Sequence, residues 1–121
     1  MNRRELGQLG EALAREYLLG AGYEIVAQND HLRHAELDLV ALDAGELVFV
    51  EVRLRSSSRF GSAAESVDAR KRQRIAAAAA ELLARGELPR ASRIRFDVIA
   101  IDGRFGKPRI THLRDAFQLG G

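Results

Sequence analysis

The chain has 121 residues, 46% of them hydrophobic, and its 19 Lys and Arg against 17 Asp and Glu give a net charge of +2. This composition excludes a disordered chain and predicts one small domain over residues 1–118, with a loose tail at 119–121. Cysteine is absent, which excludes disulfides and thiolate metal sites. No run of about 18 apolar residues occurs and no apolar segment follows the basic start, so we expect no membrane span, no signal peptide and a cytoplasmic protein.

A helix and then a strand are predicted to open the chain. Residues 4–19 have leucines at helical spacing, and the Gly-Ala-Gly at 20–22 ends the run. Residues 23–28 alternate enough for a strand, and Asn29-Asp30 has the composition of a turn. The chain therefore begins with an amphipathic helix that leads into a sheet.

The next two runs are apolar strands that each carry an acid. The first run, 35–41, contains Asp38, and the second, 47–53, contains Glu51. The residues between them, Asp-Ala-Gly-Glu at 43–46, have the composition of a tight turn. The two runs together predict a β-hairpin with one acid on each strand.

The second half of the chain predicts a polar loop at 56–62, a helix over 67–85, a strand at 94–101 and an edge strand at 109–113. The three earlier strands can form a meander, and the crossover helix should return the chain parallel to it. We therefore predict an α/β fold of helix, three-stranded meander, helix and one or two strands. Its mixed sheet would be flanked by helices in two or three layers.

The two hairpin acids are the first candidate functional residues. Alternation along the strand puts Asp38 on the face of Val40 and Leu37 on the other face, and a hairpin can bring Asp38 and Glu51 to the same side. Two carboxylates and a backbone carbonyl suit Mg²⁺ or Mn²⁺, which can polarise a phosphodiester and activate water. The alternative is that such acids are ordinary strand residues and that Glu51 pairs with Arg53 or a cross-strand arginine.

Four other residues are expected to have structural or minor roles. Asp97 should pair with Arg95 or another arginine, and His112 should lie at a strand end or on the surface. His31 and His34 are three residues apart, but they fall in a predicted loop, which makes a zinc site there a weak expectation.

Motifs that point to a family run in order along nearly the whole chain. They are the segments 7–14, 22–25, 35–40, 49–53, 60–61, 95–98 and 116–117, with Asn29, Lys71 and Arg72. In this order they resemble the YraN-like family of small bacterial proteins, a group of the PD-(D/E)xK nuclease superfamily that is related in fold to Holliday-junction resolvases. The resemblance implies a restriction-endonuclease-like core.

The resemblance also implies a metal-dependent catalytic site. Carried over by position, its catalytic residues would be Glu11, Asp38, Glu51 and Arg53, although Glu11 by itself is more typical of a solvated helix residue. Asp38, Glu51 and the carbonyl of Val52 would hold Mg²⁺ or Mn²⁺. Arg53 stands where the superfamily has lysine; arginine cannot shuttle protons near neutral pH, but it can stabilise a pentavalent phosphate.

Lys71 offers a replacement for the missing lysine. It precedes Ile75 by four residues and Leu82 by eleven, so helical periodicity puts it on the inward face of the second helix. One hypothesis is that it reaches the carboxylates and supplies the ammonium group. The alternatives are that it snorkels from the helix start or binds phosphate together with its basic neighbours.

A cluster of basic residues is a candidate phosphate-tracking surface. Its members are Arg55, Arg59, Arg70, Lys71, Arg72 and Arg74. They could equally form a merely solvated face.

The sequence and the resemblance together favour a Mg²⁺-dependent nuclease-like enzyme that acts on DNA, including branched or processed DNA. Two alternatives stay open. A weakened nuclease fold, with Arg53 in place of lysine, would bind nucleic acid or a protein partner, and a structural module would hold its acids in salt bridges. Because resolvase-like relatives act as dimers, a homodimer is a further expectation.

Overall fold

The computed structural model describes residues 2–33, 35–55, 67–102 and 107–118, and of Arg55 only the backbone. This part of the chain forms two helices and one five-stranded sheet, in the predicted order. The elements are α1 (Arg3–Gly20), β1 (Glu24–His31), β2 (Glu36–Asp43), β3 (Glu46–Arg55), α2 (Ala69–Ala84), β4 (Arg93–Asp102) and β5 (Arg109–Phe117). The predicted loop at 56–62 and tail at 119–121 lie outside the described residues.

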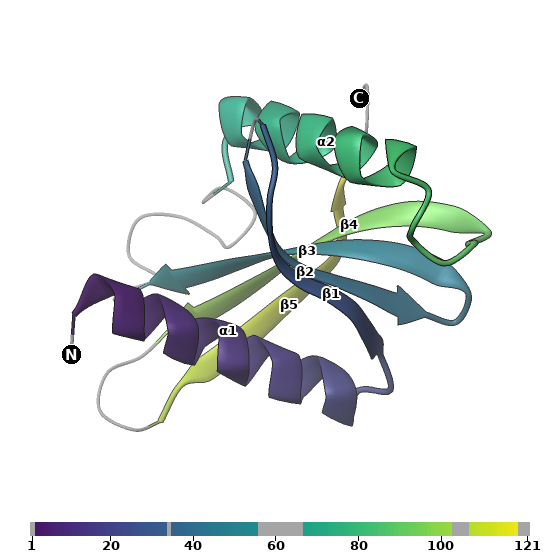
Figure 1. Ribbon diagram of the computed structural model, residues 1–121. Coiled ribbons are helices and arrows are strands. Elements are labelled where there is room, and N and C mark those ends of the chain that lie inside the picture. Colours follow the sequence, from purple (N-terminus) through teal and green to yellow (C-terminus); the bar gives the residue numbers. More distant parts are fainter. Residues whose placement is uncertain (1, 34, 56–66, 103–106, 119–121) are drawn as a thin grey trace.

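The sheet is mixed, with the strand order β1-β2-β3-β4-β5. β1, β2 and β3 form the predicted antiparallel meander, β4 runs parallel to β3 after the α2 crossover, and β5 returns antiparallel at the edge. Figure 1 shows α1 on one side of the sheet and α2 on the other, so the domain has three layers. This arrangement is a restriction-endonuclease-like α/β core. Neither helix of the described residues is long and apolar enough to cross a membrane.

The β2–β3 hairpin closes through the predicted tight turn. Asp43 pairs with Glu46, and the two residues between them, Ala44 and Gly45, have φ angles of 49° and 82°. Two successive left-handed residues make a type I′ turn, whose twist matches that of the paired strands. The turn therefore sets the register that brings Asp38 and Glu51 toward each other.

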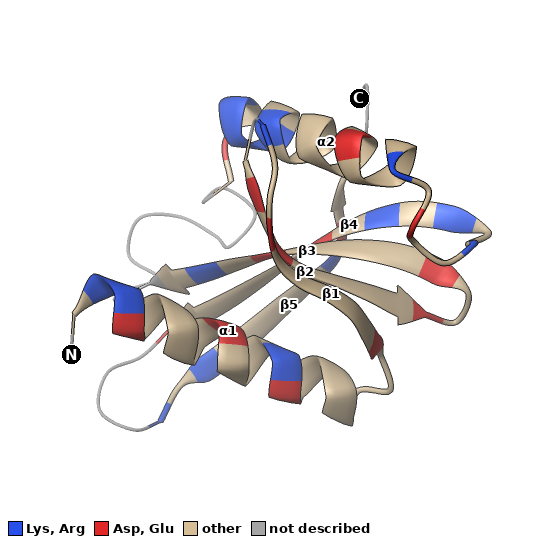
Figure 2. Ribbon diagram, in the orientation of Figure 1, with Lys and Arg blue, Asp and Glu red and all other residues tan. Residues whose placement is uncertain are grey.

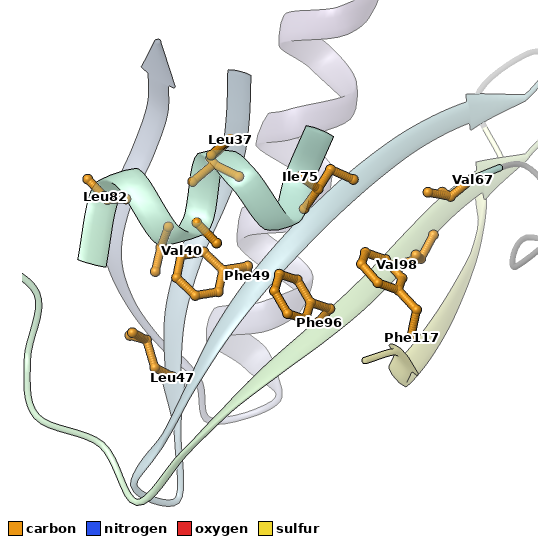
Figure 3. Close-up of a cluster of buried hydrophobic side chains, with 12 residues drawn as sticks. Leu37, Val40, Leu47, Phe49, Val67, Ile75, Leu82, Phe96, Val98 and Phe117 are labelled. Carbon is orange, nitrogen blue, oxygen red and sulfur yellow. The ribbon is translucent and has the colours of Figure 1, made fainter. Parts of the chain in front are cut away.

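The face of the sheet beneath α2 carries an aromatic core. The rings of Phe49 and Phe96 stack with their centroids 5.5 Å apart, and those of Phe96 and Phe117 stack at 5.0 Å. Ile75 and Leu82 reach this cluster from α2 (Figure 3). The inward face predicted for the second helix is confirmed, because both residues are buried.

The opposite face packs against α1. Ala14 and Leu18 of the helix are fully buried in a cluster with Val48 and Val50 of β3. Since Phe49 lies in the other cluster, β3 alternates between the two faces as predicted. Glu51 therefore continues the row of side chains that faces α2.

One predicted turn is part of a strand instead. β1 continues through Asn29 and Asp30 to His31, and Asp30 still pairs with Leu37 of β2. Asn29 adopts a left-handed conformation within the strand, with φ 55°. Asparagine tolerates this conformation better than most residues, so β1 accommodates Asn29 and its pairing with β2 continues.

The expected alternation along β2 is wrong at Leu37. Leu37 lies with Val40 in the cluster beneath α2, not on the α1 side (Figure 3). The pairing of β2 with β3 ends at Leu39 and Val50, and the first residues of β2 lean toward α2 (Figure 1). A strand freed from one neighbour can twist more strongly, which turns Leu37 toward the helix.

A buried polar network joins β4 and β5 on the α1 side. Asp97 is fully buried, and it accepts hydrogen bonds from Arg95 Nε at 2.9 Å and from the backbone N–H of Asp115 at 2.9 Å. His112 Nε2 lies 2.7 Å from the same carboxylate. The pairing with Arg95 is confirmed, whereas the surface position expected for His112 is wrong, because its side chain is only 7% exposed.

These contacts neutralise Asp97. Burial alone would raise the pKa of Asp97, but the hydrogen bonds with His112 and Arg95 and that from the Asp115 N–H lower it. Arg95 is also held by the hydroxyl of Tyr23, 2.7 Å from Nη2. In the described part of the chain, every buried polar side-chain atom has a hydrogen-bond partner.

We expect Asp97→Asn to lower the free energy of unfolding by about 3 kcal/mol at pH 7, because it breaks a buried ion pair. Because the pKa of Asp97 is lowered in the folded protein, its ionised carboxylate stabilises the fold at pH values above its usual pKa of 3.8. This contribution is lost as the pH falls through the lowered pKa. Urea unfolding should therefore show a smaller loss of stability in acid for the variant than for the wild type.

The control is Asp115→Asn, which removes an ion pair with Arg93 in which the Asp115 side chain is 35% exposed. It should change stability by less than about 1 kcal/mol. Equal effects of the two variants would contradict the structural role given to Asp97.

Candidate functional site

Asp38 and Glu51 meet where β2 and β3 separate. The last pair of the ladder is Leu39 with Val50, and Asp38 and Glu51 occupy the next opposing positions. At this point the N–H of Val52 donates a 2.9 Å hydrogen bond to Asp38 Oδ2. The side chain of Asp38 thus takes the place of a backbone acceptor, and it is held beside Glu51.

The two carboxyl groups lie close enough for each to affect the pKa of the other. Burial and, next, the negative charge of Asp38 raise the pKa of Glu51 to about 7, although the charges of Lys71 and Arg53 lower it. Burial also raises the pKa of Asp38, despite the hydrogen bond from Val52. Since Glu51 is 6% exposed, the protein holds two acids together in a place that disfavours their ionisation.

Two cations approach Glu51 without neutralising it. Lys71 Nζ lies 3.7 Å from Glu51 Oε1, and Arg53 Nη1 lies 4.0 Å from the same atom. Arg53 is the expected partner in the strand, and Lys71 reaches across from α2. Asp97 shows what close hydrogen bonding does to a buried acid in this fold, namely a lowered pKa. Within the described residues Glu51 has only these two more distant cations and its pKa stays raised, which argues against a purely structural salt bridge.

Glu11 lies on α1 near the pair. Burial raises the pKa of Glu11, and the charge of Asp38 raises it further, while a hydrogen bond with the Asn29 side chain lowers it. The contact gives the left-handed Asn29 a role that the sequence did not indicate, although the residue belongs to the family motifs. Next to it is a cavity of about 410 Å³ lined by Arg4, Gly7, Gln8, Glu11, Asn29, His31 and Glu36.

The donors available to a metal are two carboxylates and a backbone carbonyl. No group of three or more His, Asp and Glu side chains within the described segments is arranged to hold a metal ion. The N–H and C=O of one residue point to the same side of an extended strand, so the Val52 carbonyl is directed to the side on which its N–H meets Asp38. His31 pairs with Glu36 at 2.8 Å, and His34 lies outside the described residues.

Basic side chains adjoin the acids. Figure 2 shows Lys and Arg residues at the N-terminal end of α2 and acidic residues on the strands beneath it. The basic residues Arg53, Arg70, Lys71 and Arg74 line, with Asp68, a cavity of about 290 Å³.

The remaining members of the predicted phosphate-tracking surface are Arg72, Arg55 and Arg59. Arg72 donates from Nε to the carbonyl of Val67 at 2.9 Å and lies over the ring of Phe117, so its guanidinium is engaged within the fold. Arg59 and the side chain of Arg55 lie outside what the structure describes. Of the predicted surface, Arg70, Lys71 and Arg74 line one cavity together with Arg53.

The three-layer fold and the paired acids define a protein of the PD-(D/E)xK nuclease-like class. The model of the uncharacterised protein family UPF0102 matches residues 10–101. The chain belongs to this family, the YraN-like group recognised in its motifs.

Relatives from several bacteria match the chain over most of its length. UPF0102 proteins of Halorhodospira halophila and Rhodococcus jostii are 45% and 48% identical to it, over 95% and 93% of the chain and 88% and 95% of their own lengths. A UPF0102 protein of Legionella pneumophila is 41% identical over 97% of the chain and 98% of its own length.

We expect Glu51→Gln to stabilise the metal-free protein at pH 8 by on the order of 1–3 kcal/mol, because the folded state disfavours the ionised carboxylate. Glu51 ionises with its usual pKa of 4.5 in the unfolded chain and with a pKa of about 7 in the folded protein. The wild type should therefore lose stability as the pH rises between these values, and the variant should lose less.

Thermal unfolding in EDTA at pH 5 and pH 8 measures this difference. The control is Glu24→Gln, an exposed acid of β1, which should leave the melting temperature nearly unchanged at both pH values. A lower melting temperature of Glu51→Gln at pH 8 would instead support a structural salt bridge.

Proposed function

We propose that the protein is a Mg²⁺- or Mn²⁺-dependent nuclease that hydrolyses DNA, including branched or processed DNA. The observation that carries the proposal is the pair of carboxyl groups formed by half-buried Asp38 and buried Glu51, whose pKa values are both raised. Acids whose ionised forms are disfavoured in the metal-free fold are suited to a divalent cation, because its positive charge would favour their ionisation.

The residues that would hold the ion are Asp38, Glu51 and the carbonyl of Val52. This donor set fits Mg²⁺ or Mn²⁺, since Mg²⁺ is commonly bound by one or two carboxylates and completes its shell with water and substrate phosphate. When bound, such an ion polarises a phosphodiester and activates water. Glu11 would add negative charge from α1.

Hydrolysis adds water across one P–O bond. The water oxygen bonds to phosphorus, the bond to one sugar oxygen breaks, one hydrogen ends on the departing oxygen and the other stays on the new phosphate monoester. The cavity lined by Arg53, Arg70, Lys71 and Arg74 would bind the DNA phosphates next to the acids. Guanidinium and ammonium groups suit this task because they donate several hydrogen bonds to phosphate oxygens.

A second candidate function follows from Arg53. Its side chain is 38% exposed and its guanidinium lies 4.0 Å from Glu51, in the position that lysine has in the superfamily. If arginine cannot orient the attacking water, the same surface would bind nucleic acid without cutting it. Cleavage by the purified protein separates the two functions.

We expect Mn²⁺ titrated into the wild-type protein in a calorimeter to bind at one site, and binding to be lost in Asp38→Asn/Glu51→Gln. The reason is that the variant keeps the shape of both side chains but removes the two charges that attract the ion. The control is Glu24→Gln/Glu87→Gln, which removes two charges from exposed positions and should bind Mn²⁺ as the wild type does.

The same proteins are then incubated with linear duplex DNA and a four-way junction in Mn²⁺ or Mg²⁺. Cleavage by the wild type and the control, but not by Asp38→Asn/Glu51→Gln, supports the nuclease. DNA binding that resists EDTA, without cleavage by any of the proteins, would favour the binding function.

A further inference from the structure

Lys71 enters the candidate site from the helix rather than from the strand. Its Nζ lies 3.7 Å from Glu51 Oε1, slightly closer than Arg53 Nη1 at 4.0 Å, and its side chain is 32% exposed. The ammonium group is thus directed at the carboxylate and does not simply extend into solvent. One edge of it remains open to the cavity that Arg70 and Arg74 also line.

The position of Lys71 is not explained by helix stability. The side chain of Asp68 caps α2 by accepting a 2.8 Å hydrogen bond from the N–H of Lys71, which is the third residue of the helix. The first turn contains no acid, so Arg70 and Lys71 stand at the positive end of the helix dipole, where cations are unfavourable. Acids or phosphate close by would offset this cost.

An ammonium group and a guanidinium group offer different chemistry at this place. Lysine carries a compact charge with three donors that rotate freely, whereas the guanidinium is planar, larger and delocalised. A compact donor can contact a water molecule and a phosphate oxygen at once beside a crowded carboxylate pair. Lys71 is therefore better suited than Arg53 to hold the attacking water.

We infer that Lys71 of α2, not Arg53 of β3, is the catalytic cation of this site. The inference rests on the proposed nuclease function. The ammonium of Lys71 holds the attacking water against Glu51 and stabilises the negative charge that develops on the phosphate oxygens. Arg53 binds a phosphate of the DNA beside it.

The test compares cleavage of the preferred DNA substrate in Mn²⁺ by four proteins. We expect Lys71→Met to cleave at least about 100-fold more slowly than the wild type, because removing one preorganised charge-stabilising group typically costs that much. Arg53→Lys/Lys71→Met should recover at least tenfold of the loss, since it restores a lysine in the strand. The matched control is Lys107→Met, which changes the only other lysine of the chain.

Mn²⁺ binding by calorimetry is the second readout, measured on the same four proteins. We expect Lys71→Met to bind Mn²⁺ as tightly as the wild type or more tightly, because a competing cation is gone. Loss of both Mn²⁺ binding and cleavage would show that Lys71 only maintains the structure, and it would overturn the inference.

The outcomes separate this inference from the function on which it rests. If the wild type cleaves and Lys71→Met cleaves within a few-fold of it, the inference is wrong and the nuclease stands. If the wild type cleaves no DNA, the proposed function fails and the catalytic role of Lys71 fails with it.

Discussion

The hydrogen bond from the N–H of Val52 to the carboxylate of Asp38 is the contact on which the candidate site depends. It lies where the β2–β3 ladder ends, so a backbone donor that would otherwise lose its partner is satisfied by a side chain. The same contact holds Asp38 in place beside Glu51, although their charges repel when both are ionised. A single backbone group thereby links the geometry of the sheet to the spacing of two acids.

The fold treats its buried acids in two different ways. Asp97 is surrounded by Arg95, His112 and a backbone N–H, and its pKa is lowered. Glu51 has cations at 3.7 and 4.0 Å, and its pKa is raised to about 7. Among the described residues, Glu51 has no cation as close as the partners of Asp97. The raised pKa of Glu51 is a cost to stability that serves a binding site better than a core.

Much of this arrangement could be predicted from the sequence, because the patterns involved are local. Apolar spacing and turn composition act within a few residues, and they predicted the hairpin, both helices and the inward face of Lys71. The position of His112 could not be predicted, since its partners Tyr17 and Asp97 are 95 and 15 residues away. The reversal of Leu37 likewise depends on the separation of two strands, which alternation within one strand does not encode.

An arginine in the strand and a lysine in the helix reach the same oxygen of Glu51. This convergence has a consequence for how such a site can change. What hydrolysis requires is a donor and a positive charge at one point in space, and the backbone that carries them is secondary. If the protein is the proposed nuclease, Lys71 beside Glu51 would supply the ammonium that Arg53 does not, and the guanidinium of Arg53 would be available to bind phosphate. In this view Lys71 would hold the attacking water and Arg53 would bind phosphate, which would account for the departure from the superfamily pattern.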